Sequence, residues 1–205
     1  MKTMIMLLLT VFGSALKVNA QIFTNAQEDM ARQRAAEVVA QMNDYVSFMA
    51  RKDYSVNIRN RYRTQALNLY VGKGYSYELN GENRDGVIME VSSVTKNTIK
   101  KQLIRNYFTN LINLRYKDVK ITNTEVAEMK LSNLKKVDDN MYVCTCQFVM
   151  VFEGRTDRNF VYKDKTTKRI KCFVRVDEVV DEDGEKSLEF MVRLGDTQCI
   201  STERL

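Results

Sequence analysis

The spacing of apolar residues changes once along this chain, and that change restricts the fold more than any other feature. Before Lys117 apolar residues recur at steps of three and four, as on one face of an α-helix. After Lys117 they alternate, as on one face of a β-strand. A block of helices followed by a block of strands is typical of α+β domains. The sequence therefore predicts an α+β fold, with N-terminal helices packed on one face of a curved, mainly antiparallel sheet.

Two amphipathic helices are expected in the first part of the chain. The first spans 24–52 and begins at a capping box, in which Thr24 caps the helix and Gln27 reaches back to it. The second spans 55–71 and ends before Gly72, because glycine is favoured just beyond a helix C-terminus. The apolar stripe of the first helix is wide enough to cover the protein's own sheet.

A hairpin and a third helix are expected next. Two short strands joined by a glycine-containing loop fit residues 75–91. A third helix is expected over 95–114, and it should lie against the sheet. Its apolar stripe is the strongest in the chain and consists of Ile99, Leu103, Ile104, Tyr107, Phe108, Leu111 and Leu114.

Long strands are expected beyond the third helix. Asp183-Gly184 lies between two alternating runs and indicates a hairpin. Pairing Val174 with Val192 and Val176 with Phe190 would bring apolar residues together on one face of that hairpin. The expected strand-rich segments are 118–131, 140–153, 168–180 and 187–196.

The first twenty residues have the pattern of a secretory signal peptide. Lys2 supplies a positive charge, Met4 to Phe12 form a short apolar run, and Ala20 ends a small-residue cleavage site. An uncleaved anchor is the alternative. We expect residues 1–20 to be removed and residues 21–205 to form a single domain. That domain is expected to be exported, periplasmic or extracellular, with no stable membrane span after cleavage.

The absence of histidine excludes several kinds of catalytic and metal site. A chain without histidine has no Ser-His-Asp or Cys-His nucleophilic site and no His-ligated zinc. It contains neither a P-loop nor a dinucleotide fingerprint. The formal net charge of +6 is spread along the chain, so nucleic acid is not an expected partner. We expect no cofactor, no metal and no established catalytic constellation.

The four cysteines admit more than one interpretation. Cys144 and Cys146 face the apolar side of one strand and stand too far apart along it to bond each other. Cys172 lies on the apolar side of the next strand, and Cys199 follows the last one. An exported protein favours disulfides, and four cysteines allow three connectivities. One or more disulfides and four buried free thiols both remain open, whereas this spacing fits zinc poorly.

The order helix, helix, hairpin, helix and antiparallel strands over residues 24–196 resembles the nuclear transport factor 2-like superfamily. The apolar third helix between the hairpin and the strand block is the best single match. The resemblance implies a cone-shaped sheet around a pocket or a partner-binding surface, and enzymes of the superfamily place an acidic or histidine base inside the cone. The residues that could reach such an interior are Tyr45, Asp53, Tyr62, Tyr77 and Tyr107.

These observations lead to two functional hypotheses. The first is an exported, non-catalytic binding or scaffold domain that holds an unknown protein or envelope ligand, since periplasmic domains of type IV secretion scaffolds have a similar element order. The alternative is a small lyase or isomerase that uses Asp/Tyr acid–base chemistry in an apolar pocket. An apolar pocket with an Asp within hydrogen-bond reach of a Tyr would favour the enzyme. A third hypothesis is a homodimer, because the second face of 143–151 is apolar.

Overall fold

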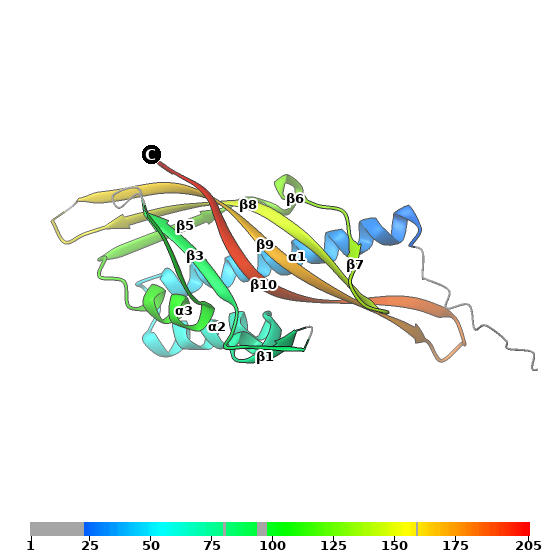
Figure 1. Cartoon of the computed structure of the whole chain (residues 1–205). Coiled ribbons are helices and arrows are strands. Elements are labelled where there is room, and N and C mark those ends of the chain that lie inside the picture. The colour runs from blue at the N-terminus through cyan, green and yellow to red at the C-terminus, as the bar shows by residue number, and fades with distance from the viewer. Residues whose placement is uncertain (1–22, 80, 94–97, 159) are drawn as a thin grey trace, which may run out of the picture.

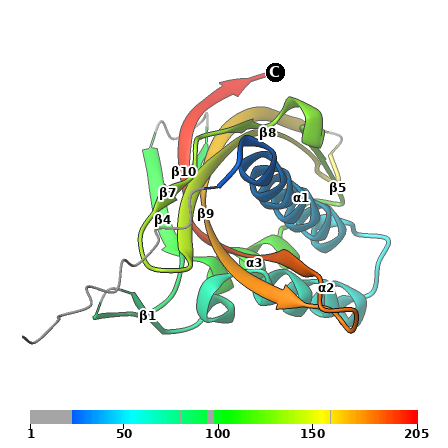
Figure 2. The ribbon, with the colours of Figure 1, turned by 90° about the vertical axis from the view of Figure 1, so that its right-hand side faces the viewer.

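The computed structural model describes residues 23–79, 81–93, 98–158 and 160–205 (Figure 1). The expected signal segment lies outside these residues. Helices α1 (Asn25–Ala50), α2 (Val56–Asn68) and α3 (Ile104–Ile112) pack against a sheet built mainly from three long strands. Figure 2 shows this sheet curling around α1, which lies in its concave face. The predicted α+β architecture is confirmed.

The capping box predicted for α1 is present. The backbone N–H of Gln27 donates to Thr24 Oγ1 (3.2 Å), and the N–H of Thr24 donates to Gln27 Oε1 (2.9 Å). Apolar residues at helical spacing form one face of α1, which is buried against the sheet and the two other helices. They include Ala35, Val39, Met42, Val46 and Met49.

The C-terminus of α3 is held by two cations from the α1–α2 region. Lys52 Nζ donates to the carbonyl oxygens of Leu114 (2.6 Å) and Ile112 (3.3 Å), and Arg59 Nη1 donates to the same Ile112 oxygen (2.8 Å). Helix carbonyls at this end have no partner within the helix, and positive charge there also interacts favourably with the helix dipole. These bonds tie α3 to α1 and α2.

The main sheet has the order β4-β3-β10-β9-β8-β5, in which every described pair is antiparallel except β3 with β10. Two short strands, β6 (Lys130–Leu131) and β7 (Lys135–Lys136), pair with β8, and a one-turn helix, η2 (Val126–Glu128), precedes them. The strands of the main path are β3 (Ile88–Ser93), β4 (Thr98–Leu103), β5 (Asp118–Asn123), β8 (Met141–Arg155), β9 (Val161–Val180) and β10 (Lys186–Arg204).

The predicted register of the last hairpin is confirmed. Val174 pairs with Val192 and Val176 with Phe190 in the β9–β10 ladder, which turns over between Val180 and Lys186. Strands β8, β9 and β10 run past the ranges expected from the sequence, and their hairpin ends extend beyond the helices at both ends of the sheet (Figure 1). The strand-rich segment expected over 118–131 is instead divided into β5, the one-turn helix η2 and β6.

The prediction of a helix over 95–114 is wrong in its first half. Thr98–Leu103 form strand β4, paired with β3 from Ser93↔Thr98 to Ile88↔Leu103, and only Ile104–Ile112 are helical. Residues 94–97 lie outside the described part of the chain. The four-residue spacing of Ile99 and Leu103 imitates a helical stripe, yet Ile99 lies in an edge strand with 55% of its surface exposed.

The single hairpin predicted over 75–91 is also wrong in its pairing. Strands β1 (Tyr77–Leu79) and β2 (Glu82–Arg84) form a separate two-stranded sheet, joined around Gly81 with φ of 77°. Glycine adopts this left-handed conformation without the steric cost of a Cβ. The later apolar residues of the segment instead form β3, which joins the main sheet. A 3₁₀ turn, η1 (Val71–Gly74), connects α2 to β1.

All four cysteines are free and buried in the structure. Cys144 and Cys172 lie directly opposite each other in the β8–β9 ladder and face the concave side. Cys146 Sγ lies 3.7 Å from Met129 Sδ, and Cys199 Sγ lies 3.2 Å from Ser92 Oγ. Of the two interpretations left open by the sequence, the structure contains four buried thiols.

Candidate functional site

A cavity of about 480 Å³ opens between α3 and the concave face of the sheet at one end of the molecule. Strands β3, β5, β8 and β9 supply one wall, and α3 supplies the other. Much of the lining is apolar, with polar groups concentrated on β3 and β9. The apolar part comprises Val91, Leu111, Leu114, Ile121, Met150 and Phe152. This volume lies in the range of small-molecule sites, which are concave and mostly apolar with few polar groups.

Strand β9 brings three polar side chains into the cavity because alternate residues of a strand share a face. Asp164, Thr166 and Lys168 precede Ile170 and Cys172 on the concave side, and all five are buried. The apolar members of this series cover α1. The polar members lie beyond the end of the helical layer, where α3 leaves the cavity open.

Asp164 forms the acidic group of the site. The Tyr162 hydroxyl donates a hydrogen bond of 2.6 Å to Asp164 Oδ2, and the aspartate is only 7% exposed. Burial raises the pKa of Asp164, while the Tyr162 hydrogen bond and the charge of Lys168 act in the opposite direction. A carboxyl group with an elevated pKa is a better proton acceptor than an ordinary surface aspartate.

Lys168 forms the basic group, and it is 4% exposed. Its Nζ donates to the carbonyl oxygen of Glu90 (3.1 Å), lies 3.6 Å from Met89 Sδ, and sits 5.8 Å from the centroid of the Tyr107 ring. Burial lowers the pKa of Lys168 to about 8, since desolvation penalises the ammonium form. The amine is therefore partly neutral near physiological pH.

Two further tyrosines line the same cavity. Burial raises the pKa of Tyr107 to about 12, with a contribution from the charge of Asp164, and burial also raises the pKa of Tyr116. Both phenols therefore stay protonated at neutral pH and can act as hydrogen-bond donors to a ligand.

Replacing Lys168 with methionine is expected to stabilise the fold by about 1–3 kcal/mol at pH 7. A pKa of about 8, against an ordinary value of 10.5, corresponds to a cost of about 3 kcal/mol for holding the charged amine in the folded state, from which the lost bond to Glu90 subtracts. Because the folded-state pKa is lowered, the cost is complete below pH 8 and vanishes as pH rises through 10.5.

Urea unfolding at pH 7 and pH 10 measures this effect. The advantage of Lys168→Met over the natural chain should shrink at pH 10. Lys171→Met, on the exposed face of the same strand, is the control and is expected to change the free energy of unfolding by less than about 0.5 kcal/mol. A destabilised Lys168→Met protein at both pH values would contradict a desolvated amine.

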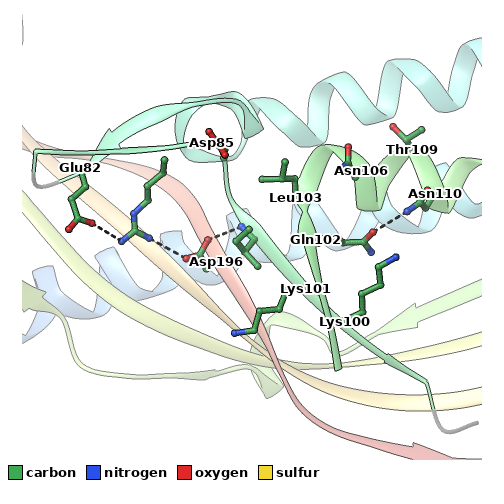
Figure 3. A pocket seen from close by; sticks show the side chains of 13 residues that line it. Glu82, Asp85, Lys100, Lys101, Gln102, Leu103, Asn106, Thr109, Asn110 and Asp196 are labelled. Carbon is green, nitrogen blue, oxygen red and sulfur yellow. Dashed lines mark hydrogen bonds and ion pairs between the residues drawn. The ribbon is translucent and has the colours of Figure 1, made fainter. Parts of the chain in front are cut away.

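A second, larger hollow of about 890 Å³ lies on the outer side of β4 and α3 (Figure 3). Three of its charged side chains pair with one another. Arg84 lies 3.8 Å from Glu82 and 3.6 Å from Asp196, which in turn accepts the backbone N–H of Ile88 (2.8 Å). Asn110 donates to Gln102 (3.0 Å). This is a solvated polar groove, and it lacks the buried acid and amine of the smaller cavity.

Of the five residues proposed from the sequence, only Tyr107 lines the cavity. Tyr45 and Tyr62 belong to an aromatic cluster between α1 and α2, with ring centroids 6.0 Å apart. Asp53 is exposed and pairs with Arg51 (2.5 Å). Tyr77 is in the small β1–β2 sheet, against Gly72.

The sequence predicts neither Asp164 nor Lys168 as a site residue, because the expected strand begins only at residue 168 and is defined by its apolar residues. Extending the alternation of Ile170 and Cys172 backwards by two-residue steps would have placed both on the concave face. Within the described ranges, no three His, Cys, Asp or Glu side chains cluster as a metal site would require. None of the helices in those ranges has the length and apolarity needed to cross a bilayer.

No family model and no curated protein sequence matches this chain. Among solved structures, it is similar to a scytalone dehydratase-like protein of Novosphingobium aromaticivorans, with a TM-score of 0.40 and 11% identity over 88% of this chain and 91% of that one. It is also similar to a hexachlorocyclohexane dehydrochlorinase, with a TM-score of 0.39 and 9% identity over 86% and 93%. Likeness at this level assigns no residue a role. The order and packing of the chain's own elements show the predicted α+β fold, with the N-terminal helices on one face of a curved, mainly antiparallel sheet.

Proposed function

We propose that this protein is a lyase or isomerase that moves a proton on a small, partly apolar molecule held in the cavity between α3 and the sheet. The observation that carries this proposal is the Tyr162–Asp164 hydrogen bond inside a largely apolar cavity. An aspartate within reach of a tyrosine in such a pocket is the arrangement that distinguishes the enzyme hypothesis from a purely structural core.

Asp164 and the cavity tyrosines Tyr107 and Tyr116 have complementary roles in proton transfer. Asp164, with its pKa raised by burial, accepts a proton from a carbon next to an electron-withdrawing group. The Tyr107 and Tyr116 hydroxyls, with their pKa values raised, are protonated donors for the oxygen on which negative charge develops. Apolar walls keep water away and strengthen these interactions.

The test is deuterium exchange at the carbon beside a carbonyl group. Cyclohexanone incubated with the protein in deuterated buffer, followed by proton NMR, reports proton abstraction without requiring the natural substrate. Exchange faster than in protein-free buffer, and suppressed by an inert competitor such as cyclohexanol, supports the proposal. Exchange at the buffer rate over a set of ketones and esters that fit the cavity would contradict it.

A second candidate function is the exported binding or scaffold domain. The observation that favours it is the long β9–β10 arm, whose outer end carries exposed Val179 and Val180 beyond the helical layer (Figure 1). Exposed apolar residues on a projecting hairpin are suited to a protein partner or a second copy of the chain. Sedimentation analysis at micromolar concentration tests self-association, and a purely monomeric protein would argue against the homodimer.

Export is part of both candidates. The motivation is the charged and apolar pattern of residues 1–20. N-terminal sequencing of the protein recovered from outside the cytoplasm should begin at Gln21. Recovery of the intact N-terminus in the cytoplasmic fraction would remove the assignment to the periplasm or extracellular space.

A further inference from the structure

We infer that Lys168 is a covalent binding site for aldehydes and ketones, which it captures as an imine inside the cavity. This inference deepens the proposed function by naming the substrate class, a carbonyl compound, and the atom that holds it. It rests on the surroundings of Nζ, on the space beside it and on the chemistry of a desolvated amine.

The amine is buried without a carboxylate at ion-pairing distance among the described residues. The backbone carbonyl that Nζ contacts belongs to Glu90. The side-chain carboxylate of Glu90 lies 3.4 Å from Lys101 Nζ and accepts the backbone N–H of Cys199 (3.0 Å). The Asp164 carboxylate is engaged by Tyr162. Among the residues that the structure describes, the polar neighbours of Nζ at hydrogen-bond distance are therefore a backbone carbonyl and a thioether. A lysine placed to stabilise the fold would be paired or would reach solvent.

The groups that face Lys168 come from every element packed around it. Cys199 on β10, Asp164 on β9 and Glu90 on β3 favour its charged form, and the Tyr107 ring of α3 lies over Nζ. Desolvation outweighs these contributions, and the pKa falls to about 8. Roughly a tenth of the amine is then neutral at pH 7, against less than a thousandth for an ordinary lysine.

The space beside the amine suits a small carbonyl compound. Lys168 lines the cavity of about 480 Å³ together with Asp164, and about 13 Å separates the two Cα atoms along the strand. Both side chains enter the same cavity from one strand face. A ligand bound to Nζ would extend along the apolar wall toward the acid.

The reaction is balanced without an external oxidant or reductant. The neutral amine attacks the carbonyl carbon, a C–N bond forms, and the electron pair of the C=O π bond moves to oxygen, which takes a proton. The resulting hydroxyl group leaves as water after a second protonation, while the nitrogen gives up both of its protons and the C=N bond forms. Amine and carbonyl thus give imine and water, with the protonated tyrosines and Asp164 able to exchange the protons.

Reductive trapping tests this inference. The full protein is treated at pH 7 with benzaldehyde and sodium cyanoborohydride, and N-benzyl-lysine is mapped by peptide mass spectrometry. We expect Lys168 to be modified at least tenfold faster than exposed Lys171 on the same strand, because so much more of its amine is neutral. That excess should shrink as the pH approaches 10. Modification of Lys168 no faster than that of Lys171 would overturn the inference.

Two variants test whether capture at Lys168 is selective and whether it is separate from proton exchange. Lys171→Met should leave the trapping rate at Lys168 unchanged, and a large loss in that variant would overturn site-selective capture. Asp164→Asn should still be trapped at Lys168 even where proton exchange is lost. Trapping at Lys168 without any deuterium exchange in the natural protein would refute the proposed enzyme and leave the carbonyl-binding site standing. Deuterium exchange without selective trapping would refute the carbonyl-binding site and leave the proposed enzyme standing.

Discussion

Replacing Asp164 with asparagine is expected to lower protein-dependent deuterium exchange into cyclohexanone by about 10²–10⁴-fold. Asparagine keeps the size of the side chain and still accepts the Tyr162 hydroxyl, but its amide has no useful basicity. General bases contribute rate factors of this size. Initial exchange rates for the natural and variant proteins, measured by NMR at equal concentration and pH 7, give the ratio.

Asp53→Asn is the matched control. Both positions hold an aspartate, but Asp53 is exposed, pairs with Arg51 and lies outside the cavity. Its replacement should leave the exchange rate within twofold of the natural protein. Loss of exchange in the Asp53 variant, with Asp164→Asn fully active, would move the base to the α1–α2 junction and refute the site described above.

Replacing Phe108 with alanine is expected to destabilise the fold by about 3–5 kcal/mol. Phe108 is fully buried in α3, packed edge-on against Tyr70 with ring centroids 6.0 Å apart. Its removal loses both the transfer free energy of the ring and the contacts around the space that it fills. Urea unfolding followed by circular dichroism measures the change.

Two further variants make this prediction decisive. Phe108→Leu keeps most of the apolar volume and should cost about 1 kcal/mol, which remains measurable even where the alanine variant does not fold. Ile58→Ala, at an exposed position of α2, should change stability by less than about 0.5 kcal/mol. Equal effects at 58 and 108 would mean that α3 does not pack into the core.

The fold was largely predictable from the sequence because its determinants are local or periodic. The capping box at Thr24 and the Asp183-Gly184 turn are short signals, and apolar alternation was enough to set Val174 opposite Val192. The error at 98–103 has the opposite origin. Those residues are strand because they pair with β3, which lies just before them in the sequence, and a largely exposed edge strand has no buried face to impose an apolar alternation.

The site was less predictable, for a physical reason that applies to Asp164 and Lys168 alike. An aspartate and a lysine in an alternating run are typical of a solvated strand face, and the sequence does not say where the helical layer ends. One face of β9 is covered by α1 at Cys172 and opens onto a cavity at Lys168. Only the packing of α3 reveals this change. Tyr107 was found because it lies in the helical stripe itself.

Strand β9 pairs differently with its two neighbouring strands. Its ladder with β8 runs without interruption from Met141↔Arg175 to Arg155↔Val161, whereas its ladder with β10 shifts register twice, between Leu194 and Thr197 and between Cys199 and Ser201. Strand β10 thus absorbs the irregularity of the curved sheet. An inserted or deleted residue at either of these shifts in β10 falls where the β9–β10 pairing is already interrupted. A deletion within β9 meets no such interruption in its ladder with β8: with Ile170 and Cys172 fixed in the core, loss of Arg169 would turn Lys168, Thr166 and Asp164 to the outer face of the sheet.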